Sequence, residues 1–257
     1  MNTRDTTPAP PDREVIVVET ETQLVRHSYV DPGPELLRAS GTWTVSDETE
    51  GSGLLRDLAA KGLLRPGQIL VQSPYDPSTY FRAADARVNA SEEKHFVFTQ
   101  LCRLLGATRV TQEVVERHEE KGVHKLSAEA GKGPFKFKLS GQDQAETRLA
   151  SRIALDDKYA GHPANIEAAK ALLAKQGLLD DPFLKSCVDA RSGGNELTSR
   201  TWTVELSQEV EHKLALAARL VKAKLVTVDG SGSADWLTKK SYRAHYSVAF
   251  TSASRAT

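Results

Sequence analysis

Apolar and polar residues alternate in two segments of the C-terminal part of the chain. From 201 to 206, and again from 242 to 250, every second residue is apolar. A period of two places one face of a β-strand on a core and the other face in water. The pattern therefore predicts two half-buried strands.

The segment between these strands fits two patterns. As a helix over 208–222 it begins after Ser207, a good N-cap, carries Glu209 and Glu211 at its positive end, and buries one apolar stripe. As a strand, the alternation that starts at Trp202 continues to about residue 220. Strands usually have about 5–6 residues, and Ala and Leu favour helix. We therefore predict a helix at 208–222 and keep a long strand as the alternative.

Four more helices are predicted from capping residues and from apolar positions spaced three and four apart. The clearest begins after Ser91, has Glu92 and Glu93 in its first turn, and stops at Gly106. The four predicted helices are 54–61, 92–105, 164–176 and 182–190.

Short runs rich in β-branched, aromatic or alternating residues predict the remaining strands. Between 107 and 160, turn residues separate these runs, which indicates an antiparallel meander. The predicted strands are 15–18, 42–45, 69–71, 109–116, 123–130, 135–139 and 149–159.

Together these elements predict the α+β class, with one antiparallel, meander-type sheet covered by several amphipathic helices. Residues 1–13 contain three Pro among Thr and Asp and predict a disordered tail. We expect a single domain over 14–257, with a mixed α/β half at 14–106 and a β-rich half at 107–250 that includes the helices near 164–190 and 208–222.

Charge is balanced overall but is unevenly distributed. The 257 residues include 34 Lys and Arg and 34 Asp and Glu, so the formal net charge of +0 gives no general attraction to nucleic acid. Residues 1–50 hold four basic and ten acidic residues, whereas 213–243 hold seven basic and two acidic ones. Either the two segments neutralise each other, or the basic one binds an anionic partner. The residues expected to lead such binding are Lys222, Lys224, Lys239 and Lys240.

The two cysteines, Cys102 and Cys187, lie on apolar faces of predicted helices. We therefore expect buried thiols in a reducing compartment, although the sequence leaves a disulfide open. Residues 1–13 have no apolar signal region, and no run of ~18 apolar residues occurs. The expected location is cytoplasmic.

Candidate catalytic chemistry is sparse. Glu116, His118, Glu120 and His124 form a carboxylate–imidazole set that could ligate a metal, but their spacing matches no zinc signature. His95 and Cys102 are seven residues apart on one helix, about 10.5 Å along its axis, which is too far for a thiol–imidazole pair. We expect a polar surface and a core thiol, with no cofactor.

These patterns favour a non-enzymatic intracellular binding or assembly protein with a protein or other anionic partner. The first alternative is a membrane-acting, pore-forming-like β-protein that uses amphipathic strands at 198–220 and 242–250. The second is an enzyme whose site is assembled from residues distant in sequence.

Overall fold

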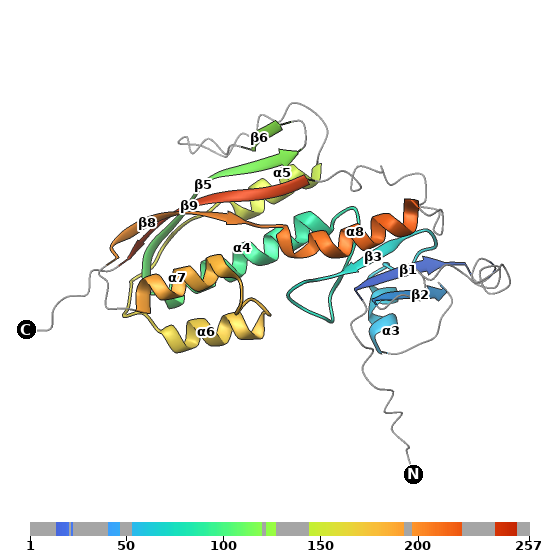
Figure 1. Ribbon diagram of the computed structural model, residues 1–257, viewed down its shortest axis with the longest axis horizontal. Helices are drawn as coiled ribbons and strands as arrows, with labels where there is room; N and C mark the ends of the chain where they lie inside the picture. Colours follow the sequence, from blue (N-terminus) through green and yellow to red (C-terminus); the bar gives the residue numbers. More distant parts are fainter. Residues whose placement is uncertain are drawn as a thin grey trace, which may run out of the picture. The chain divides into compact units, whose positions relative to one another are not determined.

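A computed structural model describes residues 14–20, 22, 41–46, 53–119, 122–126, 144–192, 197–222 and 240–250. The chain folds into two compact units, and each contains one sheet (Figure 1). Unit 1 takes its described residues from Met1–Ser73, Pro77–Ala84 and His212–Leu237, and unit 2 takes the others. The predicted tail at 1–13 and the predicted strand at 135–139 lie outside the described residues.

Unit 1 contains a four-stranded sheet in the order β2-β1-β3-β4. The central strands β1 and β3 pair antiparallel, as do β3 and β4, whereas β1 and β2 are parallel. The strands are β1 (Val15–Glu19), β2 (Thr42–Ser46), β3 (Ile69–Gln72) and β4 (Tyr80–Arg82).

The short helix α3 (Gly53–Ala60) supplies the other side of the unit 1 core. Its Leu55 and Leu58 are buried together with Ile16 and Val18 of β1 and Leu70 of β3. All residues of β1 are buried, which explains its continuous β-branched sequence: a strand covered on both faces shows no alternation.

Unit 2 contains an antiparallel sheet in the order β6-β5-β9-β8, with the short β7 also paired to β5. Two irregularities interrupt the register between β5 and β9, whereas β8 pairs with β9 without interruption. The strands are β5 (Ala107–Glu119), β6 (Gly122–Leu126), β7 (Asp156–Lys158), β8 (Ser199–Glu205) and β9 (Lys240–Phe250).

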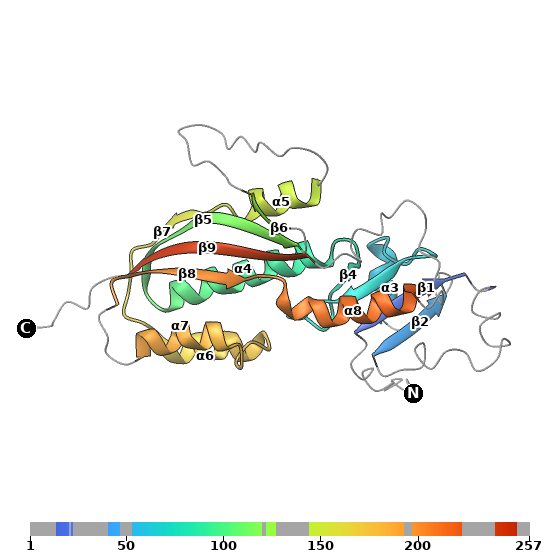
Figure 2. The same ribbon diagram turned by 45° about the horizontal axis from the view of Figure 1, so that its top comes forward.

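Helix α4 (Ala86–Leu104) lies along one face of this sheet (Figure 2). The ring of its Phe98 is 4.6 Å from that of Tyr246 on β9 and 5.8 Å from that of Trp202 on β8. These strands alternate as predicted, because Tyr246 and Trp202 are buried while their neighbours His245 and Thr203 lie on the opposite face.

Three further helices belong to unit 2, namely α5 (Gln144–Ile153), α6 (Ile166–Lys175) and α7 (Pro182–Ser192). Helices α5 and α6 pack against α4, and α7 packs against α6. Asn165 caps α6 by accepting a hydrogen bond from the Ala168 N–H at 3.0 Å, and Asp181 does the same for Leu184 of α7 at 2.8 Å.

The segment after β8 is helix α8 (Gln208–Lys222), so the helical prediction is confirmed and the long-strand alternative is wrong. Strand β8 ends at Glu205, and Ser207 turns the chain by accepting a hydrogen bond from the Tyr242 N–H at 3.2 Å. The first four residues of α8 are counted with unit 2 and the rest with unit 1. Among the described helices, none is long and apolar enough to cross a membrane.

Other predictions need correction. The run at 149–159 is not one strand: it contains the end of helix α5, up to Ile153, and then the short strand β7. Leu149 and Ile153 are four residues apart and are both buried on one helical face. Helix α4 starts at Ala86, and the predicted cap Ser91 is buried in its interior. The described strands form two sheets rather than one, and the unit 2 sheet is not a meander because β9 lies between β5 and β8.

Candidate functional site

The first half of α4 buries polar side chains where a core helix normally has apolar ones. Arg87 is 8% exposed, while Lys94 and His95 are each 2% exposed. Removing a charge from water costs several kcal/mol unless it is paired and hydrogen-bonded. The partners of these residues therefore define the polar centre of unit 2.

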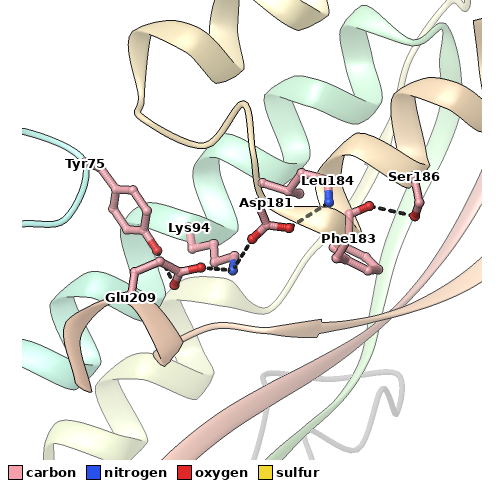
Figure 3. A network of polar contacts seen from close by, with 7 residues as sticks. All are labelled: Tyr75, Lys94, Asp181, Phe183, Leu184, Ser186 and Glu209. Carbon is pink, nitrogen blue, oxygen red and sulfur yellow. Dashed lines mark hydrogen bonds and ion pairs between the residues drawn. The ribbon is translucent and has the colours of Figure 1, made fainter. Parts of the chain in front are cut away.

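Lys94 binds two carboxylates from separate elements (Figure 3). Its Nζ donates to Asp181 Oδ2 at 3.0 Å and to Glu209 Oε1. Asp181 immediately precedes α7, and Glu209 lies in the first turn of α8. One buried ammonium thus connects the starts of two helices to the middle of a third.

Tyr75 is a second hydrogen-bond donor to Glu209. Its hydroxyl donates to Glu209 Oε2 at 2.9 Å, and its side chain is buried. Burial, followed by the charge of Glu209, raises the pKa of Tyr75 far above its ordinary value. Tyr75 therefore stays protonated and acts as a hydrogen-bond donor rather than as a base.

Asp181 has a capping role and an ion-pairing role. Its Oδ1 accepts the N–H of Leu184 at 2.8 Å while Oδ2 faces Lys94. Burial opposes ionisation of Asp181, but the backbone N–H of Leu184 and the charge of Lys94 outweigh it and lower its pKa. Asp181 is therefore a carboxylate at neutral pH and stabilises the first turn of α7.

A second cation of α4 holds the same turn of α8. The Arg87 guanidinium binds Glu211 through two parallel hydrogen bonds, Nε to Oε1 at 2.7 Å and Nη2 to Oε2 at 3.1 Å. This bidentate geometry is the strong form of an arginine–carboxylate pair. We call Tyr75, Arg87, Lys94, Asp181, Glu209 and Glu211 the α8 anchor.

A neutral polar pair lies next to the anchor on α4. His95 Nδ1 is 2.6 Å from the hydroxyl of Tyr246, and their rings stack with centroids 5.7 Å apart. Burial lowers the pKa of His95 to about 4, against a smaller opposing effect of Asp157, and it raises the pKa of Tyr246. At neutral pH the pair is an uncharged imidazole and an uncharged phenol.

Both cysteines are free and buried, as predicted. Burial is the largest cause that raises the pKa of Cys102 well above its ordinary value, and it raises that of Cys187 to about 12. Nucleophilic and metal-binding chemistry require the thiolate, so at neutral pH these thiols act as core residues.

Two of the four predicted metal candidates, Glu116 and His118, lie together on the face of the unit 2 sheet that points away from α4. His118 Nε2 is 3.1 Å from Glu116 Oε2, and His245 of β9 places its Nε2 3.4 Å from the same oxygen. His245 was not predicted. Strand β6 places His124 opposite Arg117, and Glu120 lies outside the described residues. Within the part of the chain that the structure describes, no group of three or more His, Cys, Asp or Glu residues could hold a metal ion.

The predicted anion-binding lysines are only partly described. Lys222 is the last residue of α8, and Lys224 and Lys239 lie outside the described ranges. Lys240 begins β9; its Nζ is 3.7 Å from Glu119 Oε1, and its side chain is only 16% exposed. The structure therefore gives Lys240 an acidic neighbour within its own sheet.

Comparison of this chain with protein-family models, with curated proteins and with solved structures gives no match. The geometry described above is therefore the basis for the functional interpretation.

Proposed function

We propose that this chain is a non-enzymatic binding or assembly protein that contacts an acidic protein partner through its basic segment 213–243. The observation that carries this proposal is the α8 anchor. It accounts for Glu209 and Glu211, the two acidic residues that directly precede the segment.

The acids at the start of α8 are bound internally. Glu209 accepts from Lys94 and Tyr75, and Glu211 accepts from Arg87. Both lie immediately before the basic segment, where they would otherwise offset its charge. Because their counter-ions come from α4, they contribute little to the field of the residues that follow.

Two of the basic residues in the segment also have acidic partners. Lys240 lies near Glu119, and Arg243 Nε donates to Glu205 Oε2 at 2.6 Å. A third basic residue, Lys213, donates to Gln72 Oε1 at 3.2 Å. The segment's other basic residues are Arg219, Lys222, Lys224 and Lys239, and its acidic residues are Asp229 and Asp235. Arg219 is exposed on α8. A cationic segment of this kind supports recognition of an acidic surface.

The test is a charge reversal that avoids the paired residues. Lys222→Glu, Lys224→Glu and Lys239→Glu are combined, and binding of fluorescently labelled poly-L-glutamate is followed by anisotropy over a salt series. Exposed ion pairs contribute roughly 0.2–1 kcal/mol each, so three of them predict a loss of about 3-fold to about 150-fold. Binding by the unaltered chain should weaken with salt, since exposed charges are screened over about 8 Å at physiological ionic strength.

The matched control reverses three exposed lysines elsewhere, Lys61→Glu, Lys175→Glu and Lys185→Glu, and so changes the net charge equally. We expect the control to bind nearly as well as the unaltered chain. Equal losses in the two triple variants, or no binding by the unaltered chain, would show that the segment is an ordinary solvated surface.

A further inference from the structure

Within the described residues, the unit 2 sheet ends on one side at strand β8. In this part of the chain β8 pairs only with β9, so its other side is the edge of the sheet. Proteins usually protect such edges with Pro, bulges or inward-pointing charges. Strand β8 contains no Pro, and its register with β9 is uninterrupted. Its one charge on the face of Trp202 is Arg200, which lies near the start of the strand and is exposed. The opposite side of β5, in contrast, is covered by β6 and β7.

The backbone groups that point away from β9 can be identified from the ladder. The Leu206 N–H donates to Tyr242 O, and Thr198 O accepts from the Phe250 N–H, each at 2.8 Å. In an antiparallel pair the inward-pointing and outward-pointing residues alternate. The even-numbered residues of β8 therefore bond to β9. The residues whose N–H and C=O point outward are Ser199, Thr201, Thr203 and Glu205.

We propose that a second copy of this chain pairs with this edge, β8 against β8 in antiparallel orientation, to form a two-fold symmetric dimer with one continuous sheet. This inference uses the backbone of β8 rather than the basic segment, so it is independent of the proposed function.

One register satisfies the geometry. With Trp202 opposite Trp202 of the second copy, Thr201 faces Thr203 and Ser199 faces Glu205. Every outward-pointing residue then meets another, and each such pair exchanges both of its backbone hydrogen bonds. Shifting the register by two residues in either direction leaves outward-pointing groups at one end of each strand without a partner.

The side chains agree with self-pairing in this register. Directly opposed residues share a face, so the buried side of one sheet continues into that of the other. No like charges are opposed, and the Ser199 hydroxyl can donate to the Glu205 carboxylate of the second copy. The formal net charge of +0 adds no long-range repulsion between copies.

The first test is the oligomeric state of the full chain, measured by sedimentation velocity over a range of concentrations. We expect a dimer that Thr201→Pro converts to a monomer. Proline removes an N–H that points outward, and it leaves the β8–β9 hydrogen bonds in place. Unchanged far-UV circular dichroism would show that the variant is folded.

The second test measures the register and does not depend on the proline variant. Opposed Thr201 and Thr203 have an expected Cα separation of about 5.5 Å, within reach of a disulfide. Under mild oxidation the double variant Thr201→Cys/Thr203→Cys should form a covalent dimer, and neither single variant should do so. A monomeric unaltered chain, a folded Thr201→Pro variant that still dimerises, or crosslinking by the single variants would overturn the proposal. Pairing of the edge with an added peptide by a monomeric chain would overturn it as well.

Discussion

Replacing Lys94 with Met should destabilise unit 2 by about 3 kcal/mol. The substitution keeps the apolar stem and removes the ammonium that Asp181 and Glu209 share. Removing one partner of a buried ion pair typically costs about 3–5 kcal/mol, because the remaining charge stays buried. The lower end applies because the Asp181 and Glu209 side chains keep 11% and 21% of their exposure and so retain some hydration.

The assay requires a signal from unit 2 alone. The chain has three tryptophans, Trp43, Trp202 and Trp236, so changing Trp43 and Trp236 to Phe leaves Trp202 as the only one. Trp202 is 3% exposed and packs edge-on against Phe98, hence its fluorescence reports opening of the core between α4 and the sheet. Urea titration in this background, with and without Lys94→Met, gives the difference in free energy of unfolding.

The effect of Lys94→Met should depend on pH. The folded-state pKa of Asp181 lies below its ordinary value of 3.8, so its ionised form stabilises the fold above that value, and this contribution is lost as pH falls through the folded pKa. Without Lys94 one of the groups that lower this pKa is gone. The difference between the two proteins should therefore be complete at about pH 7 and should shrink below about pH 4, as the Asp181 carboxylate protonates.

Two controls separate charge from packing. Lys61→Met changes an exposed lysine and should alter stability by less than about 0.5 kcal/mol. Adding Asp181→Asn and Glu209→Gln to Lys94→Met should recover much of the loss, because no unpaired charge remains and Asn caps α7 as well as Asp does. A loss below about 1 kcal/mol, or one that is equal at about pH 7 and about pH 3, would refute the assignment of a buried ion-pair network.

Three further substitutions test the fold. Ala217→Pro should destabilise unit 1 by about 3 kcal/mol or more in thermal unfolding, since Ala217 is buried in the middle of α8, and a stability loss below about 1 kcal/mol would contradict a helix there. Cys102→Ala should cost about 1 kcal/mol in urea titration because it leaves a small void, and rapid alkylation of this thiol in the native chain would contradict its burial. Gly106→Ala should cost more than about 1 kcal/mol in thermal unfolding, because Gly106 has φ +83° and an added Cβ would lie 2.1 Å from His162 O. Unchanged stability of this variant would disprove the close approach of residue 106 to His162.

Local sequence patterns predicted most of the helices and strands, because periodicity and capping involve residues that are close in the sequence. The stripe and caps of 208–222 were sufficient to predict α8, and alternation was sufficient for β8 and β9. The same rules failed for α5, where the apolar positions of 149–159 satisfy a period of two as well as a spacing of four. Sheet order was not predictable, because local sequence does not indicate that β9 pairs with both β5 and β8.

The α8 anchor was not predictable for a related reason. Lys94 contacts Asp181 and Glu209 at separations of 87 and 115 residues. The sequence pattern placed Glu209 in the first turn of a predicted helix and assigned no role to Lys94. The available signal was weak: a lysine between apolar positions of α4. The pairing of Glu116 with His118 did follow from the period of two, whereas His245 required knowledge of the β5–β9 register.

The central position of β9 has a consequence for synthesis of the chain on the ribosome. Strands β5 and β8 share no hydrogen bonds with each other, and their common neighbour is the last of the described strands to be translated. Until residues 240–250 leave the exit tunnel, the aromatic face around Trp202 and Phe98 has no Tyr246 to cover it. A nascent chain at this stage exposes apolar surface and two unpaired strand edges, the features by which chaperones and unwanted partners bind incomplete folds. Closure of unit 2 therefore waits for β9, and it requires contacts between distant parts of the sequence, which form slowly.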